Sequence, residues 1–159
     1  MKKFELTAEV KAFFGIKLFR IKALIAFGNV RAGELGGWVK KESNLAQDGN
    51  ARVYGDARVY GNAWVYDDAR VSGNAWVSAD ADWITLSPIG SENGVLTAFK
   101  QKDETVMVHR GCFSGTIEEF ESAVNKRHYD NKHGEIYRHV ISLLKLRFNL
   151  SSCHKEMNI

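Results

Sequence analysis

The sequence has few residues of the kinds that cross-link a chain or anchor it in a membrane. Its 159 residues include one proline and two cysteines, Cys112 and Cys153, which lie in unlike surroundings. Two such cysteines provide neither a disulfide framework nor the paired cysteines of a zinc site. No stretch approaches the roughly 18 uninterrupted apolar residues of a membrane helix. A signal peptide is not expected either, because charges interrupt the apolar start at Glu5, Glu9 and Lys11. We therefore expect a cytoplasmic protein that makes no membrane contact.

Common catalytic and nucleotide-binding motifs are also missing. The chain contains no G-x-x-x-x-G-K-[ST], G-x-G-x-x-G or G-x-S-x-G, and its five histidines are not spaced as metal ligands. His109 and Cys112 are three residues apart in an extended segment, so their side chains point to opposite faces and do not form a base and nucleophile pair. We expect Cys112 to be buried between turns. These absences predict a protein that is not an enzyme and that holds no cofactor or metal.

The feature that the sequence does have is a six-residue phrase repeated without a gap from Asn50 to Thr85. The copies read NARVYG, DARVYG, NAWVYD, DARVSG, NAWVSA and a degenerate DADWIT. The second position is always Ala, and the fourth is Val until Trp83 ends the run. A fixed short period is the signature of a solenoid.

The chemistry of the phrase explains how such a chain can coil. Positions two and four are apolar and two residues apart, so in an extended strand both point to one face and fill a narrow interior. Asn, Asp and Gly at the junctions tolerate left-handed backbone angles, which lets the chain turn a corner. The phrase resembles the repeat of the hexapeptide left-handed β-helix, in which three sides make one triangular coil. This resemblance implies about two coils, with residues eighteen apart stacked on each other.

Positions three and five of the phrase should point outward. They carry Arg, Trp and Tyr, the residues that dominate protein interfaces, and stacking would bring Arg58 beside Trp76 for a cation–π contact. We expect these rows to form a subunit interface, since a two-coil solenoid has little interior of its own. Stabilisation of an exposed β-surface, or binding of a ligand or nucleic acid, are the alternatives. The predicted interface comprises Arg52, Tyr54, Arg58, Tyr60, Trp64, Tyr66, Arg70 and Trp76.

The segments on either side of the repeats are predicted to differ from them. Residues 1–49 are expected to be an N-terminal β cap and first coil, because the end of a solenoid exposes unpaired strand edges that another segment must cover. Apolar residues alternate with a mixed set over residues 18–27, which predicts a strand there. Residues 1–41 hold nine Lys or Arg against three Glu, a net +6, which suits an acidic partner or is simply a solvated face. Residues 50–85 are the solenoid. Residues 86–150 are predicted to be a small α+β domain, and residues 151–159 a polar tail.

Two helices and a hairpin are expected in the C-terminal domain. Residues 95–108 have the alternation of a hairpin with its turn at 101–104. Thr116 and Glu119 form a capping box that starts a helix, and a second helix follows from residue 134. Its predicted buried side consists of Ile136, Tyr137, Val140, Ile141, Leu144 and Phe148.

The best candidate for chemistry is an anion site in this domain. A helix N-terminus and glycine-rich loops allow backbone N–H groups to approach an anion, and an arginine nearby can bind a phosphate with two hydrogen bonds. The alternative is that these small residues only make turns. The candidate ligand-binding residues are Arg110, Ser91, Asn93, Ser114, Gly115 and Thr116.

The whole order of the chain resembles a group of small proteins from phage and prophage genomes that carry a hexapeptide or YdcK-like solenoid repeat. The stretches that carry the resemblance are LFRIKALIAFGNVRAGELGGWVKKESNLAQDG, the repeats, SPIGSENG, RGCFSGTIEEFESAV and HGEIYRHVISL. Hexapeptide acyltransferases share the repeat, but their solenoids are longer and place a catalytic His on or beside a coil, whereas no repeat here contains His.

The resemblance and the residues together lead to three hypotheses about function. The first is a homo-oligomeric binding protein of a bacterial host's cytoplasm that counters host defence by sequestering a small molecule, such as a phosphate-bearing nucleotide immune signal. The second is a protein-binding inhibitor or oligomeric scaffold that uses the Arg/Trp/Tyr surface. The third is an acyltransferase. Nucleic acid is not expected as a partner.

Overall fold

The computed structural model describes residues 1–150, so the predicted tail and Cys153 lie outside the described residues. Strands dominate the first two thirds of the described chain, and both α-helices follow the last strand. The elements in chain order are β1 (Phe4–Phe13), β2 (Ile16–Ala23), β3 (Leu35–Val39), a 3-10 turn (Glu42–Asn44), β4 (Arg52–Val53), β5 (Arg58–Val59), β6 (Arg70–Val71), β7 (Trp76–Val77), a second 3-10 turn (Asp80–Asp82), β8 (Trp83–Ile89), β9 (Gly94–Lys100), β10 (Val106–Arg110), β11 (Phe113–Thr116), α1 (Ile117–Arg127) and α2 (Lys132–Arg147).

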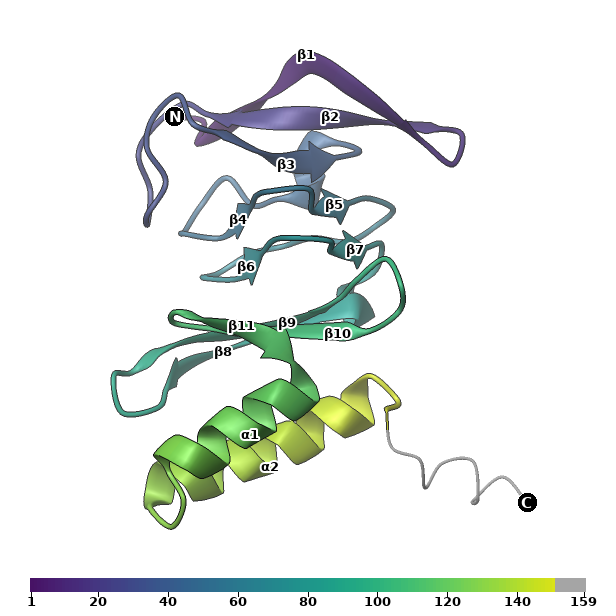
Figure 1. Cartoon of the computed structure of the whole chain (residues 1–159). Helices are drawn as coiled ribbons and strands as arrows, with labels where there is room; N and C mark the ends of the chain where they lie inside the picture. The colour runs from purple at the N-terminus through teal and green to yellow at the C-terminus, as the bar shows by residue number, and fades with distance from the viewer. Residues whose placement is uncertain (151–159) are drawn as a thin grey trace, which may run out of the picture.

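The repeats form parallel ladders at the predicted eighteen-residue spacing. Val53 pairs with Val71 between β4 and β6, and Val59 pairs with Val77 between β5 and β7. A third ladder consists of the single bridge between Leu45 and Val65. We name the three sides of the coil after these pairs: the β4–β6 side, the β5–β7 side and the Leu45–Val65 side. The ladders remain separate, open sheets (Figure 1).

The interior is as narrow as the alternation of Ala and Val predicts. In the first five copies the Ala residues are at most 1% exposed and the Val residues at most 2%, whereas Ala81 of the degenerate sixth copy is exposed. Glycine at the sixth position turns the corners: Gly61 has a φ of +57°, and a Cβ there would lie 2.5 Å from the carbonyl oxygen of Ser78. The core of the coils comprises Ala51, Val53, Ala57, Val59, Ala63, Val65, Ala69, Val71, Ala75 and Val77.

An antiparallel hairpin of β1 and β2 lies at one end of the stack (Figure 1). The predicted strand at 18–27 is present as β2, shifted toward the N-terminus, and the undecided stretch before it forms β1. β2 pairs with β3, and β3 continues in parallel into β5 and β7. Phe4 and Ile21 of the hairpin belong to the same apolar core as the coils.

The opposite end of the stack meets a four-stranded antiparallel sheet in the order β11-β10-β9-β8. One face of this sheet contacts the coils, where Phe99 joins their core. Its other face packs against α1 and α2 through Leu96, Ala98 and Val108. Figure 1 shows both helices on the side of the sheet away from the coils. The predicted hairpin and both helices are thus confirmed.

Two details of the helices fix their placement. The capping box at the start of α1 is formed as predicted, with the Glu119 N–H donating to Thr116 Oγ1 over 3.1 Å. At the end of α2, Arg147 Nη2 donates to the Trp83 carbonyl over 2.9 Å and so ties the helix to the last coil. Ile136 was predicted to be buried but is 40% exposed, because it lies at the edge of the apolar stripe of α2. Neither helix of the described residues is long and apolar enough to cross a membrane.

Candidate functional site

Arg110 and Ser91 lie together at a cavity of about 350 Å³ in the C-terminal part of the chain. The cavity opens between the turn after β8, the turn between β10 and β11, the middle and end of α1, and the early part of α2. Strand β10 ends at Arg110, and the register with β9 places this residue opposite Leu96, on the helix side of the sheet. The structure therefore brings two of the six predicted ligand-binding residues into one site.

The guanidinium group of Arg110 is held in a fixed position. Its Nε donates to the Tyr137 hydroxyl over 3.0 Å, and its Nη2 donates to the Ile89 carbonyl over 3.1 Å. The backbone of Gly94 packs so closely that a Cβ there would lie 2.6 Å from Nη1. A side chain at position 94 would displace the guanidinium group, so Arg110 can keep this position only because residue 94 is glycine.

Aromatic rings form the floor of the cavity. Phe113 of β11 and Phe120 of α1 have ring centroids 5.3 Å apart, and Phe120 meets Tyr137 of α2 edge-to-face at 5.4 Å. Arg127 and Glu92 contribute one charge of each sign to the wall. The site thus combines a fixed cation with apolar ring faces, which are the two chemical features that an aromatic anion requires.

His128 adds a neutral polar group to the same wall. Burial is the main reason that the pKa of His128 lies below its usual value of 6.5. The neighbouring His133 and Arg127 lower it further, and the hydrogen bond with Asn131 opposes the shift. The ring is therefore uncharged at pH 7 and can accept or donate one hydrogen bond.

The remaining predicted ligand-binding residues lie elsewhere. Asn93 occupies a turn with a φ of +50° and does not line the cavity. Ser114 pairs with His109 in the sheet and lies beside that ring, on the face toward the coils. The Thr116 N–H donates to Glu119 Oε1 over 2.9 Å, and Gly115 is covered by Phe113 and Glu119. The capping box therefore occupies groups of the helix N-terminus that we had expected to receive an anion.

Sequence reasoning missed the aromatic and helical part of the site. The sequence predicts Tyr137 only as a buried residue of the second helix, and Arg127 is not singled out. A usable signal was present, since Phe120, Val124 and Arg127 follow each other at helical spacing and share a face. Cys112 is exposed rather than buried, because the turn after Gly111, with its φ of +59°, carries it to the rim of the cavity.

The predicted interface residues are divided among the three sides of the coil. On the β5–β7 side, the guanidinium carbon of Arg58 lies 5.7 Å from the centre of the Trp76 ring, which confirms the predicted cation–π contact. The chain's own hairpin covers this row, because Phe13 lies 5.1 Å from Tyr60 and 4.9 Å from Trp76 between ring centroids.

The row on the β4–β6 side meets the C-terminal sheet. Tyr54 bonds through its hydroxyl to His109 Nε2 over 2.8 Å, and Arg70 Nη2 donates to the Val95 carbonyl over 3.0 Å. Arg52 stacks on the Tyr54 ring at 4.5 Å. These contacts within the chain use much of the surface that we expected another subunit to cover.

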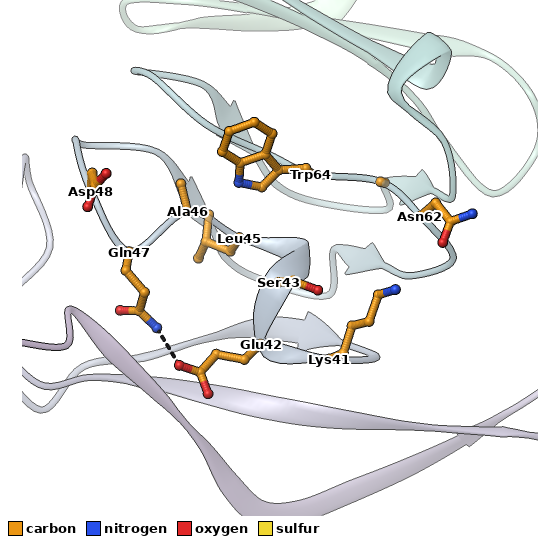
Figure 2. Close-up of a pocket in the computed structure, with 10 residues that line it drawn as sticks. Lys41, Glu42, Ser43, Leu45, Ala46, Gln47, Asp48, Asn62 and Trp64 are labelled. Carbon is orange, nitrogen blue, oxygen red and sulfur yellow. Dashed lines mark hydrogen bonds between the residues drawn. The ribbon is translucent and has the colours of Figure 1, made fainter.

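Only the Leu45–Val65 side presents its aromatic residues openly. Trp64 and Tyr66 are 49% and 36% exposed, with ring centroids 4.5 Å apart. Trp64 borders a groove of about 630 Å³. Figure 2 shows Lys41 and Asp48 at opposite ends of this groove. Asp48 therefore lies at one end of the groove, and Lys41 lies at the other end beside the acidic Glu42.

No group of three or more potential metal ligands occurs within residues 1–150. The ladders at eighteen-residue spacing and the filled, narrow interior define a β-solenoid. Comparison with known families agrees, because residues 51–67 and 63–79 each match the family described as YdcK Beta solenoid repeat. The chain thus contains a YdcK-like β-solenoid. No curated protein matches the chain.

Proposed function

We propose that this protein binds a phosphate-bearing aromatic small molecule, of the nucleotide type, in the cavity beside Arg110. The observation that carries the proposal is the convergence of Arg110 and Ser91 with the rings of Phe113, Phe120 and Tyr137 on one cavity. Its volume of about 350 Å³ lies within the range of small-molecule pockets, about 300–1,000 Å³.

Each group in the cavity has a role in this proposal. The ring faces of Phe113 and Phe120 stack against the base, and Arg110 attracts the phosphate without moving, because Tyr137 and Ile89 already hold it. The Ser91 hydroxyl supplies a hydrogen bond at the rim. We propose that the ligand is held and not converted, so that the protein acts by sequestration.

The biological setting in the proposal comes from the resemblance to phage and prophage proteins. In that setting the chain acts in the bacterial cytoplasm as a counter-defence protein, and the ligand is a nucleotide signal of the host. We also propose that the coils are left-handed, as in hexapeptide solenoids, and that the β1–β2 hairpin is their N-terminal cap. The cap is supported by Lys3, whose buried ammonium group donates to the Ala51 carbonyl over 2.8 Å.

The experiment is native mass spectrometry of the full chain before and after incubation with a deproteinised extract of phage-infected bacteria. We expect a stoichiometric mass increase in the wild-type protein. Ala123→Phe, on the cavity side of α1, should abolish the increase by filling the cavity. Ser122→Phe, on the neighbouring exposed position, is the matched control and should retain it. Equal mass gain in both variants would place the ligand outside this cavity.

A second function, an oligomeric scaffold, is favoured by the exposed Trp64 and Tyr66 beside the groove of Figure 2. A two-fold axis through this face would bring Lys41 of one copy against Asp48 of the other. The test is sedimentation velocity. Lys41→Glu or Asp48→Lys alone should dissociate the wild-type dimer, and the double variant should restore it. A wild-type monomer at high concentration would refute self-association through this face.

A further inference from the structure

Two arginines lie next to each other on the β4–β6 side without an acidic partner. Arg52 and Arg70 are directly paired in the parallel ladder, where neighbouring strands lie about 4.8 Å apart. The ion pairs within residues 1–150 join Lys2 to Glu42, Arg20 to Glu9, Lys100 to Asp82 and Lys145 to Glu121, and neither arginine takes part. The two arginines therefore occupy directly paired positions of adjacent strands, and no ion pair within residues 1–150 neutralises either of them.

The donors of this pair are also incompletely used. The Nε atoms of both Arg52 and Arg70 are buried and make no hydrogen bond within the described chain. Burial is the main reason that the pKa of Arg70 lies below its usual value, and the charges of Arg52 and Arg110 lower it further. Tyr54 and Cys112 oppose that shift, and no carboxylate does so.

Tyr54 and His109 hold the pair in place and add no negative charge at neutral pH. His109 Nδ1 lies 3.0 Å from the Phe113 carbonyl, which only accepts, so Nδ1 carries the proton and Nε2 accepts from the Tyr54 hydroxyl. Burial, followed by the charges of Arg70 and Arg52, lowers the pKa of His109, and the ring is neutral. The site is thus pre-organised and electropositive.

Arg58 shows that this arrangement is not a general property of the repeat. It occupies the same position of the phrase, and its Nε is also buried and unpaired. Its ladder partners, however, are Trp38 and Trp76 rather than another arginine, and its guanidinium carbon lies 4.8 Å from the centre of the Phe13 ring. The chain itself surrounds Arg58 with aromatic rings, whereas the Arg52–Arg70 pair has the single Tyr54 ring against Arg52 and no carboxylate in an ion pair.

We propose that Arg52 and Arg70 form a second anion site, which binds a phosphate group. A dianion with several acceptor oxygens neutralises two adjacent guanidinium groups at once and accepts hydrogen bonds from their Nη groups, which a single carboxylate does less completely. The site does not depend on the cavity beside Arg110. The two are separated by the start of β9, where Arg70 donates to the Val95 carbonyl and Arg110 packs on the preceding Gly94.

The test is isothermal titration of the full chain with inorganic pyrophosphate at low and at high ionic strength. We expect binding that weakens with salt. Arg52→Gln combined with Arg70→Gln should weaken it at least tenfold, the loss expected when hydrogen bonds to a charged group are removed. Arg58→Gln is the matched control and should bind like the wild type. Absence of pyrophosphate binding to the wild type, or equal loss in Arg58→Gln, would overturn the proposal.

A further arm separates the two anion sites. Ala123→Phe fills the cavity beside Arg110 and should leave pyrophosphate binding unchanged. If that variant loses pyrophosphate binding as well, the phosphate belongs to the cavity ligand and the second site is refuted. Replacing both arginines removes a repulsion, so the melting temperature of the ligand-free double variant should be no lower than that of Arg58→Gln. This control distinguishes a loss of the binding site from a loss of folding.

Discussion

Asn44 should be one of the most sensitive polar residues in the chain. Its side chain is fully buried at the corner of the first coil, where Oδ1 accepts from the N–H groups of Lys40 and Lys41 over 3.1 and 2.9 Å. Nδ2 donates to the carbonyls of Ala63 and Gly61 over 2.8 and 3.3 Å. One amide group therefore joins two successive coils.

The expected effect of Asn44→Ala follows from these four bonds. Lys40 retains a second partner in the Val59 carbonyl, whereas the buried Ala63 carbonyl loses the bond from Nδ2. About 2 kcal/mol for an unsatisfied buried carbonyl and about 1 kcal/mol for the part-buried groups together lower the free energy of unfolding by ~3 kcal/mol. With a urea m-value of about 2 kcal/mol per molar, the unfolding midpoint should fall by about 1.5 M.

The assay is urea unfolding followed by tryptophan fluorescence and circular dichroism. Asn74→Ala is the matched control, since Asn74 is an exposed turn residue of a later repeat, and its midpoint should change by less than about 0.3 M. If Asn44→Ala shifted the midpoint no more than Asn74→Ala, the buried amide would not be what holds the first two coils together.

Three further predictions concern the coils and their first end. Gly61→Ala should destabilise the protein by at least about 1 kcal/mol more than Gly73→Ala in the same urea assay, because both have positive φ but only Gly61 meets a backbone oxygen; equal effects would show that strain alone matters. Burial lowers the pKa of Lys3 from 10.5 to about 8, so between these pH values the unfolded chain binds more protons than the folded chain. The melting temperature of the wild type should therefore rise with pH relative to that of Lys3→Met. Parallel plots of melting temperature against pH for the two proteins would contradict this. In a double-mutant cycle of Arg52→Gln and Arg70→Gln, the coupling free energy of unfolding should show a repulsion of about 1 kcal/mol between the two arginines at low salt, and this repulsion should shrink as salt is added. An attractive coupling free energy would show that the two charges do not repel each other.

Much of the fold was predictable because the residue types within each repeat determine its local backbone geometry. Ala and Val at alternating positions determine which face is buried, and glycine at the corners sets the length of each side. The first coil could not be predicted in this way, because its residues pair with residues twenty positions later rather than eighteen. This longer coil contains the 3-10 turn Glu42–Asn44, in which Asn44 is fully buried, whereas the asparagines that start the repeats are exposed.

The candidate sites were less predictable, for a different physical reason. The outward rows were correctly identified as outward, but a row faces solvent only if no other segment of the chain covers it. Phe13 covers the β5–β7 row and His109 reaches the β4–β6 row from segments distant in sequence. Likewise, the cavity beside Arg110 exists only because β10, α1 and α2 converge. Repeats determine local geometry, whereas these sites depend on long-range contacts that no repeat encodes.

The narrow interior also limits where a ligand can bind. The coils are filled mainly by Ala and Val, which are at most 2% exposed in the first five copies of the repeat, so the solenoid itself has no room for a small molecule. Binding must then occur on its outside or at its ends. The C-terminal sheet closes one end, and its helix side forms the cavity beside Arg110, while His109 on its other face supports the Arg52–Arg70 pair. A single sheet thus contacts both proposed anion sites. The junction of solenoid and sheet, including the outward Arg52 and Arg70, is therefore the region where substitutions should alter binding without unfolding the coils, whereas substitutions at the inward Ala and Val positions should unfold them.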